Sequence, residues 1–388
     1  MGGDDRPVML PITRSTAIAF NGSPNPTIGV EMELQIVDPT TRKMVNAGPR
    51  LVEAVGDPMH VKPELLECCV ELNTGICKDM AEVRADLGGR LERVQAVADE
   101  LGLVLVGTGT HPFAQWNELA VTNEERYIGL LDRMQWLARR FMIFGLHVHV
   151  GVSDGEKAIA ISNSLTSYLP FLLGLSSSSP FWLGEDTGLA SSRIKIFEAL
   201  PTAGLPPYMR NWNQFVSYMN TLITAGAISS IQEVWWDVRP HLAFGTIEVR
   251  VCDGVNTLSE VCSLVALVQT LIVHLAQRYD SGQQLPMLKE WTIKENKWRA
   301  CRWGTDARII INERGDQMSL ARKLEEIIEE LEPTARDLGS HGDLERVRGL
   351  LHNPSFKRQR RVYKETRSLT AVVDACAEEL RTDRPTVL

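Results

Sequence analysis

The sequence predicts an α+β protein in which helices cover one face of a β-sheet and the other face carries charged side chains. Four segments alternate apolar and polar residues with the period of a β-strand. Much of the remaining chain repeats apolar residues at the spacing of an amphipathic helix. Because each strand needs a cover for its apolar face, we expect the four strands to share one sheet beneath these helices.

The N-terminal region leads directly into the first strand. Residues 1–26 contain four prolines and are expected to form an irregular lead-in. Residues 27–388 contain no linker long enough to divide two domains, so a single domain that ends in C-terminal helices is expected. Its first strand is Thr27–Asp38, where apolar side chains alternate with Glu31 and Glu33.

Three further segments alternate in the same way as the first strand. They are Cys69–Asn73, Phe144–Val152 and Gly245–Asp253. Their polar positions carry Glu71, then His147 and His149, then Glu248 and Arg250. The apolar run Leu103–Val106 is expected to be a buried strand, since it is short and follows a glycine.

Helical spacing of apolar residues predicts most of the remaining elements. Helices are expected at Ala81–Leu101, Glu124–Arg140, Glu156–Leu175, Trp212–Ala225, Leu258–Gln277, Leu320–Leu331, Leu344–Leu351 and Ser368–Leu380. Pro170 is expected to kink or break the third of these helices. Two basic stretches, Lys294–Arg302 and Lys357–Arg361, are expected between helices.

Composition and charge argue against several classes of protein. The chain of 388 residues carries a net charge of −8, which disfavours a general binder of nucleic acid or of anionic membranes. The longest apolar run, Val261–Ala276, is interrupted by polar residues, so we expect a buried helix there and no membrane span. Irregularly spaced cysteines, and an N-terminus without the features of a signal peptide, predict a cytoplasmic protein with free thiols.

The charged residues of the four strands predict a metal and phosphate site. Glu248 and Arg250 would stand about 6–7 Å apart on one strand face, which suits a metal ion beside a phosphate group. A solvated face with a cross-strand ion pair would give the same local pattern. Over all four strands, however, carboxylates gather without any lysine, and they repel one another unless cations neutralise them. Oxygen ligands favour Mg²⁺ or Mn²⁺ over zinc.

A set of ordered motifs extends this pattern over most of the chain, from about residue 27 to residue 361. The motifs are Gly29–Glu33, Glu71–Gly75, Gly109–Phe113, Gly145–Gly151, Ser179–Trp182, Asp186–Gly188, Ala199–Thr202, Gly204–Tyr208, Trp235–Asp253, Glu295–Ala300 and Arg358–Arg360. Together they resemble the type 2 glutamate–cysteine ligase family, the bacterial carboxylate–amine ligases.

The resemblance implies a fold similar to the catalytic domain of glutamine synthetase. In that fold a curved antiparallel sheet forms an active-site funnel and helices pack on its outer face, so residues 27–388 would be the single catalytic domain. The resemblance further implies that the metal ligands are Glu31, Glu33, Glu64, Glu71, His147 and Glu248. Arg250 would contact the transferred phosphate, and Arg250 and Glu248 would be the catalytic residues. Glu67 competes with Glu64 for its role.

The resemblance also implies a set of nucleotide- or substrate-binding residues, namely His149, Arg193, Asn296, Arg299, Arg358 and Arg360. Several of these have alternatives. His149 could instead be a metal ligand or a structural histidine, and the arginines of the two basic stretches could form a solvated face. His111 could contact substrate or be a turn residue.

The implied activity is an ATP-dependent ligation with Mg²⁺ or Mn²⁺ as cofactor. ATP would phosphorylate a carboxylic acid, for which glutamate is one candidate, and an amine, for which cysteine is one candidate, would displace the phosphate to form an amide. The chain has no Walker loop, so metals and arginines would have to hold the nucleotide. The alternatives are another Mg²⁺-dependent phosphoryl-transfer enzyme on the same fold and a non-catalytic nucleotide-binding homologue. The resemblance also suggests a homodimer.

Overall fold

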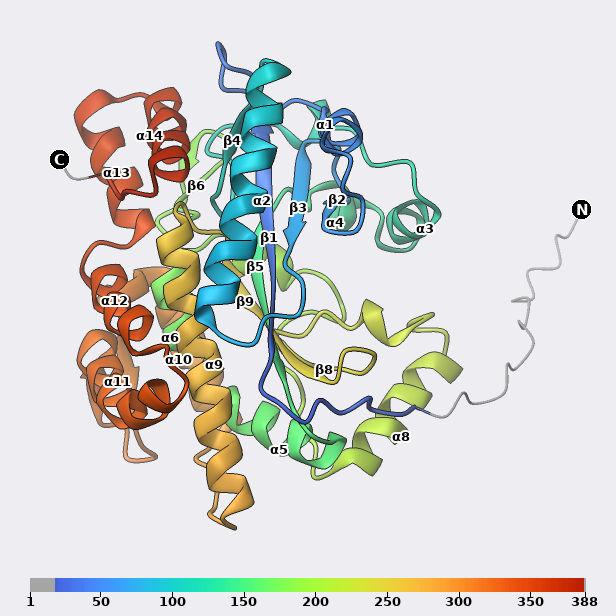
Figure 1. Ribbon diagram of the computed structural model, residues 1–388, viewed down its shortest axis with the longest axis vertical. Helices are drawn as coiled ribbons and strands as arrows, with labels where there is room; N and C mark the ends of the chain where they lie inside the picture. Colours follow the sequence, from blue (N-terminus) through green and yellow to red (C-terminus); the bar gives the residue numbers. More distant parts are fainter. Residues whose placement is uncertain (1–17, 387–388) are drawn as a thin grey trace, which may run out of the picture.

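The computed structural model of the protein describes residues 18–386 (Figure 1). Most of the predicted lead-in, residues 1–17, therefore lies outside the described residues. Residues 18–26, the described part of that lead-in, have no helix or strand.

The centre of the molecule is a seven-stranded antiparallel sheet with the strand order β2-β3-β1-β5-β9-β8, to which β4 adds by pairing with β1. Its strands are β1 (Ile28–Val37), β2 (Val61–Pro63), β3 (Cys69–Asn73), β4 (Val104–Val106), β5 (Gly145–Gly151), β8 (Val238–His241) and β9 (Thr246–Asp253). The four alternating segments predicted from the sequence are β1, β3, β5 and β9, and they are neighbours in this sheet. The sheet is open, and the predicted α+β fold is confirmed.

Helices α2 and α9 cover the apolar face of the sheet: α2 contacts β1 and β3, α9 contacts β5, and Figure 1 shows the two helices side by side. Alternate residues of the strands, such as Val30, Val148 and Val249, are completely buried in the core beneath these helices. A capping box between Thr257 and Glu260 fixes the start of α9. Within residues 18–386, α9 is the one unbroken helix long and apolar enough to span a membrane, yet most of it is buried inside the protein as a core helix.

The helices agree with the predicted segments except in a few places. They are α1 (Gly48–Val55), α2 (Met80–Glu100), α3 (Glu125–Met134), α4 (Trp136–Arg139), α5 (Gly155–Leu165), α6 (Leu169–Ser176), α7 (Arg193–Phe197), α8 (Trp212–Thr224), α9 (Leu258–Asp280), α10 (Glu290–Trp303), α11 (Leu320–Asp337), α12 (His341–His352), α13 (Ser355–Thr366) and α14 (Leu369–Thr382). Short 3-10 turns occupy Trp116–Glu118, Ile231–Glu233 and Gly304–Asp306, and two small ribbons pair β6 (Phe181–Trp182) with β7 (Glu185–Asp186) and β10 (Arg308–Ile310) with β11 (Gln317–Ser319).

The two basic stretches were predicted wrongly as segments between helices. Lys294–Arg302 lies inside α10 and Lys357–Arg361 lies inside α13. The apolar periodicity of these two segments is too weak to predict a helix. Many of their residues have long basic side chains, and the helices pack through only a few apolar or small residues. Pro170 does break its helix as predicted, since it stands in the first turn of α6.

Candidate active site

Strand register brings the predicted charged residues together on the face of the sheet opposite α2 and α9. In the ladders Glu31 stands opposite His147, Glu33 opposite Glu71, and His149 opposite Glu248. Directly opposed residues in an antiparallel sheet have their side chains about 5 Å apart on the same face. Four strands therefore combine isolated carboxylates and imidazoles into one cluster.

Glu31 lies at the centre of this cluster between two histidines. Its Oε2 is 2.9 Å from Nδ1 of His147, and its Oε1 is 3.3 Å from Nε2 of His149. Burial raises the pKa of Glu31, but the contacts with the two imidazoles outweigh burial and hold this pKa well below its usual value. Burial and the nearby Arg250 lower the pKa of His147 to about 4, so His147 is a neutral imidazole that can donate its Nδ1 proton to Glu31.

Glu248 is 1% exposed and is held by two arginines. Arg239 Nε donates to Glu248 Oε2 at 2.7 Å, and Arg250 Nη1 contacts Oε1. Burial raises the pKa of Glu248, but the two guanidinium charges outweigh this and keep it well below its ordinary value. Arg239 was missed from the sequence, although an arginine one hairpin away from Glu248 is the signal that could have found it.

A second group of carboxyl groups has the opposite electrostatics. Burial, together with the charge of Glu71, raises the pKa of Glu33 to about 7, and burial with neighbouring acids raises the pKa values of Glu64 and Glu71 as well. Glu33 Oε2 accepts a hydrogen bond from the Gly145 amide at 2.5 Å. Three carboxyl groups thus stand close together with less positive charge than their ionised forms require, which is the environment that a bound cation would relieve.

The donor atoms of the cluster fit a divalent cation. Two groups each place three ligand atoms within 4.8 Å of one another: Glu31, His149 and Glu248 in one group, and Glu31, Glu71 and His147 in the other. The buried His149 Nε2 lies 3.3 Å from Glu31 Oε1 without hydrogen-bond geometry, so the two atoms are placed to share a cation. The geometry therefore gives His149, for which a metal ligand was one of the alternatives left open by the sequence, a position equivalent to that of the predicted ligand His147.

A small pocket of about 60 Å³ adjoins the cluster at the Gly145 end of β5. Its polar wall contains Glu33, Glu64, His147, Arg193 and Arg250, and its other wall contains Leu65, Leu66, Phe141, Ile143, Phe144 and Phe197 together with Cys69. The cations and the apolar wall suit a small organic acid whose carboxylate points toward the cluster.

Arg193 is 2% exposed and enters this pocket from the start of α7. Its guanidinium donates to the carbonyl oxygen of Arg250 at 3.3 Å, and a Cβ atom at Gly145 would overlap it. The Arg193 amide donates to Ser179 Oγ at 3.1 Å, and Ser179 in turn donates to the fully buried Asp253 at 2.6 Å. This network holds the serine-rich segment against β9 and so fixes the position of Arg193.

Three other predicted nucleotide- or substrate-binding residues hold structural contacts. Asn296 is buried and exchanges two hydrogen bonds, 2.8 and 2.7 Å long, with the backbone of Ile310. Arg299 pairs with Glu295 of its own helix. Arg360 forms a two-pronged ion pair with Asp186 at 2.6 and 3.0 Å. None of these three lines the pocket beside the cluster, and their predicted ligand contacts stay predictions.

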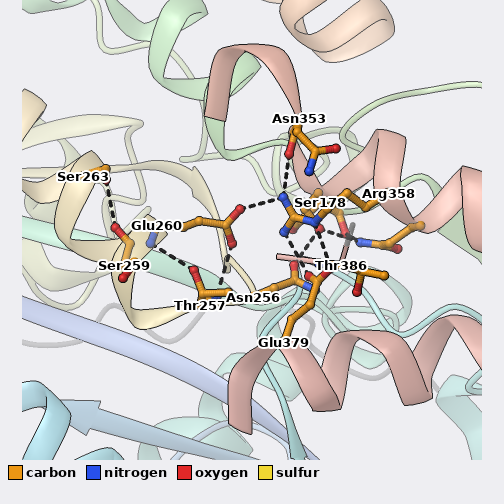
Figure 2. Close-up of polar contacts among 12 residues, drawn as sticks. Ser178, Asn256, Thr257, Ser259, Glu260, Ser263, Asn353, Arg358, Glu379 and Thr386 are labelled. Carbon is orange, nitrogen blue, oxygen red and sulfur yellow. Dashed lines mark hydrogen bonds and ion pairs between the residues drawn. The ribbon is translucent and has the colours of Figure 1, made fainter. Parts of the chain in front are cut away.

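Arg358 lies in a buried ion-pair network away from the strand cluster (Figure 2). Its guanidinium contacts Glu260 at 2.7 Å and Glu379 at 2.8 and 2.9 Å, and it donates to the Asn353 carbonyl at 2.6 Å. These partners belong to α9, α14 and the start of the segment before α13. A phosphate could reach Arg358 only if both ion pairs opened, so we assign it a structural role in place of the predicted ligand contact.

His111 is a buried turn residue, one of the two alternatives left open by the sequence. Its Nε2 lies 2.8 Å from the Arg42 carbonyl oxygen, and its Nδ1 accepts from the Ala114 amide at 3.0 Å. Burial lowers its pKa to about 4, so the ring is neutral and carries its proton on Nε2. All seven cysteines are buried free thiols, which agrees with the prediction of unpaired cysteines.

Comparison with known proteins decides the family. The family model described as glutamate–cysteine ligase family 2 matches residues 27–373. The chain belongs to this family. A relative from Gloeobacter violaceus, provisionally named glutamate–cysteine ligase 2, is 46% identical over 366 residues that cover 92% of this chain and 97% of the relative. A relative from Thermobifida fusca with the same name is 46% identical over 378 residues, which cover 95% and 94%.

Two solved structures share the fold of this chain. A glutamate–cysteine ligase from Francisella tularensis, solved in complex with AMP, superposes with a TM-score of 0.66 at 14% identity and covers 94% of this chain and 90% of its own. A bifunctional glutathione synthetase from Pasteurella multocida gives 0.63 at 15% identity, covering 92% and 52%. The glutamate–cysteine ligase family 2 member described here is thus a carboxylate–amine ligase, an enzyme that forms carbon–nitrogen bonds.

Proposed function

We propose that this ligase is ATP-dependent, requires Mg²⁺ or Mn²⁺, and forms its amide through an acyl phosphate. The observation that supports the proposal is the cluster of Glu31, Glu33, Glu71 and Glu248 with two histidines, beside the guanidinium groups of Arg250 and Arg193. So many carboxyl groups on one sheet face repel one another less when cations are bound, and cations with arginines are what the oxygens of a nucleotide triphosphate require.

The cluster would hold the cations through Glu31, Glu33, Glu64, Glu71, His147, His149 and Glu248. When bound, divalent cations supply charge neutralisation for phosphate oxygens. Glu31 and Glu248 are ionised at neutral pH, since their pKa values lie well below the ordinary value, and both are ready to act as ligands. Glu64 faces the pocket and shares a hydrogen bond with Glu71, whereas Glu67 does not line the pocket, which favours Glu64 in the proposed set.

The first chemical step is the attack of a substrate carboxylate oxygen on the γ-phosphorus of ATP, with ADP as leaving group. Arg250 would neutralise the charge that spreads over the transferred group, and its guanidinium is oriented by the contact with Glu248. Arg193 projects into the pocket and would bind the acid. In the second step the amine nitrogen attacks the acyl carbon, the bond to phosphate breaks, and inorganic phosphate leaves.

Glutamate is a candidate acid and cysteine a candidate amine because the relatives bear names of glutamate–cysteine ligases. The AMP complex of the Francisella tularensis enzyme supports the use of an adenine nucleotide. A cytoplasmic location and a homodimer complete the proposal.

ADP release measures this function directly. The purified protein would be assayed with Mg²⁺ and ATP against a matrix of acids, including glutamate, and amines, including cysteine. We expect ADP release that requires both an acid and an amine. Release that requires the acid alone and yields a stable phosphorylated product would instead show a kinase-like phosphoryl transfer, and no release with any pair would favour a non-catalytic homologue.

Variants of Arg250 connect the activity to the cluster. Arg250→Ala and Arg250→Lys are expected to lower kcat by at least about 100-fold, because the planar guanidinium cannot be replaced by an ammonium group. Arg381→Ala is the matched control, since Arg381 forms a surface ion pair with Asp99 and should leave kcat unchanged. Near-normal turnover in both Arg250 variants would refute the assignment.

A further inference from the structure

The charged strand face ends, on the side opposite the pocket, at the hairpin that joins β8 to β9. This hairpin displays Phe244, whose side chain belongs to a residue 60% exposed to solvent. The Phe244 ring is stacked on the ring of His241, with centroids 4.1 Å apart and planes inclined by only 17°. His149 meets the edges of both rings at centroid distances of 5.7 and 5.3 Å. The aromatic pair therefore lies directly beside a histidine of the cluster.

Hydrogen bonds to neighbouring backbone segments hold the turn that carries Phe244 in place. The backbone amide of Asn21 donates to the Leu242 carbonyl oxygen at 3.0 Å, and the backbone amide of Val152 donates to the Gly245 carbonyl oxygen at 2.9 Å. Gly245 has a φ of 65°, and a Cβ atom there would overlap the carbonyl oxygen of Asn21, so the close approach requires glycine. The Phe244 amide donates to His241 Nδ1 at 3.3 Å, which orients the His241 ring. The exposed ring is thus held in a defined position.

Packing does not explain why Phe244 is aromatic. It belongs to none of the hydrophobic clusters formed by the described residues, whereas its neighbour Leu242 packs against one of them. His241 covers one face of the Phe244 ring, and most of the side chain stays accessible. A rigid aromatic surface that adjoins His149, whose Nε2 lies 3.3 Å from the carboxylate of Glu31, suits a flat ligand with a charged group.

We propose that Phe244 and His241 form a shelf on which the purine base of the nucleotide stacks. The phosphates would then extend past His149 toward Glu31 and Glu248. This inference rests on the proposed ATP-dependent function and adds the site of the base. The other end of the cluster is less suitable for a purine, because the pocket there has a volume of only about 60 Å³ and is lined by Phe144 and Phe197. Stacking tolerates any base with a flat face, so the shelf would supply affinity with little discrimination among purines.

Titration calorimetry with two probes, ADP and tripolyphosphate, each with Mg²⁺, separates the shelf from the cation cluster. Loss of one stacked base costs about 1–3 kcal/mol, so Phe244→Ala is expected to weaken ADP binding by about 5- to 150-fold. Tripolyphosphate binding should stay within about twofold of wild type, since this probe has no base. Phe244→Trp should bind ADP at least as tightly as wild type. Trp291→Ala, which removes another exposed aromatic side chain, is the control and should change neither affinity.

The outcomes distinguish failure of the shelf from failure of the function. Equal ADP affinity of wild type and Phe244→Ala, or parallel losses for both probes, would overturn the shelf while nucleotide binding itself stands. A change only in the oligomeric state of Phe244→Ala, measured by light scattering, would also overturn it and assign Phe244 to contacts between copies of the chain. Wild-type protein that binds neither probe would refute the proposed function and the shelf together.

Discussion

Glu33→Gln tests the electrostatics of the carboxyl cluster most directly, because it should stabilise the metal-free protein and destroy its response to metal. In the folded protein the pKa of Glu33 is about 7, against an ordinary value of 4.5. Between these two values the folded state binds more protons than the unfolded state, so stability falls as pH rises from 4.5 to 7 and the full penalty applies above pH 7. Glutamine carries no charge and keeps an oxygen that can accept the hydrogen bond from the Gly145 amide.

The size of the effect follows from the two pKa values. Their difference corresponds to at most about 3 kcal/mol at pH 8, and water in the adjoining pocket would reduce this figure. For a chain of 388 residues the entropy of unfolding is about 0.8 kcal/mol per degree, so the melting temperature should rise by up to about 4 °C. At pH 5 the wild-type carboxyl is largely protonated and the two proteins should melt within about 1 °C of each other.

Differential scanning fluorimetry in a chelator and in excess MgCl₂ measures both parts of the prediction. Wild-type protein should be stabilised by Mg²⁺ at pH 8, whereas Glu33→Gln should lose most of this gain, since one ligand is weakened and the repulsion that the cation relieves is already absent. Glu67→Gln is the control, because Glu67 lies in the same sheet region without lining the pocket. A lower melting temperature of Glu33→Gln in chelator at pH 8, or an unchanged response to Mg²⁺, would refute this reasoning.

Three further predictions concern buried ionisable residues. Arg358→Met should lower the free energy of unfolding by about 3–5 kcal/mol in urea titrations, because two buried carboxylates lose their partner. KM for ATP should stay unchanged in the fraction that folds. The control Arg360→Ala, which removes a surface ion pair, should lower the free energy of unfolding by less than about 1 kcal/mol, and equal losses in the two variants would contradict the structural role of Arg358. Glu248→Gln should lower stability as well as activity, because it leaves the guanidinium groups of Arg239 and Arg250 without a counter-charge; an unchanged urea midpoint would argue against this. In the folded protein the pKa of His111 is about 4, below its ordinary value of 6.5, so the unfolded state binds a proton more readily than the folded state. His111 therefore lowers the free energy of unfolding by up to about 3 kcal/mol as pH drops from 6.5 to 4. His111→Asn should show a flatter curve of urea midpoint against pH, and a curve identical to that of wild type would rule out this contribution.

Much of the fold and of the candidate site could be predicted from local patterns. Alternation places Glu31 and Glu33 on one face of β1, whatever the neighbouring strand, because successive side chains of a strand point to opposite faces. The same rule groups the charged residues of β3, β5 and β9, and the absence of lysine among them indicates cations. Helix α9 could likewise be identified as a core helix from its apolar sequence interrupted by a few polar residues.

The sequence by itself therefore determined which side chains face the active-site side of the sheet, and, through its motifs, the family. The tertiary structure alone decided which of these side chains meet. Register pairs His149 with Glu248 and brings Arg239 to the same carboxylate, and helix packing buries Arg358 between two acids although its basic neighbours suggest a solvated surface. The physical reason is that alternation is a property of a few consecutive residues, whereas strand register and helix packing depend on contacts between distant segments, and a register shift of one residue would dismantle the cluster.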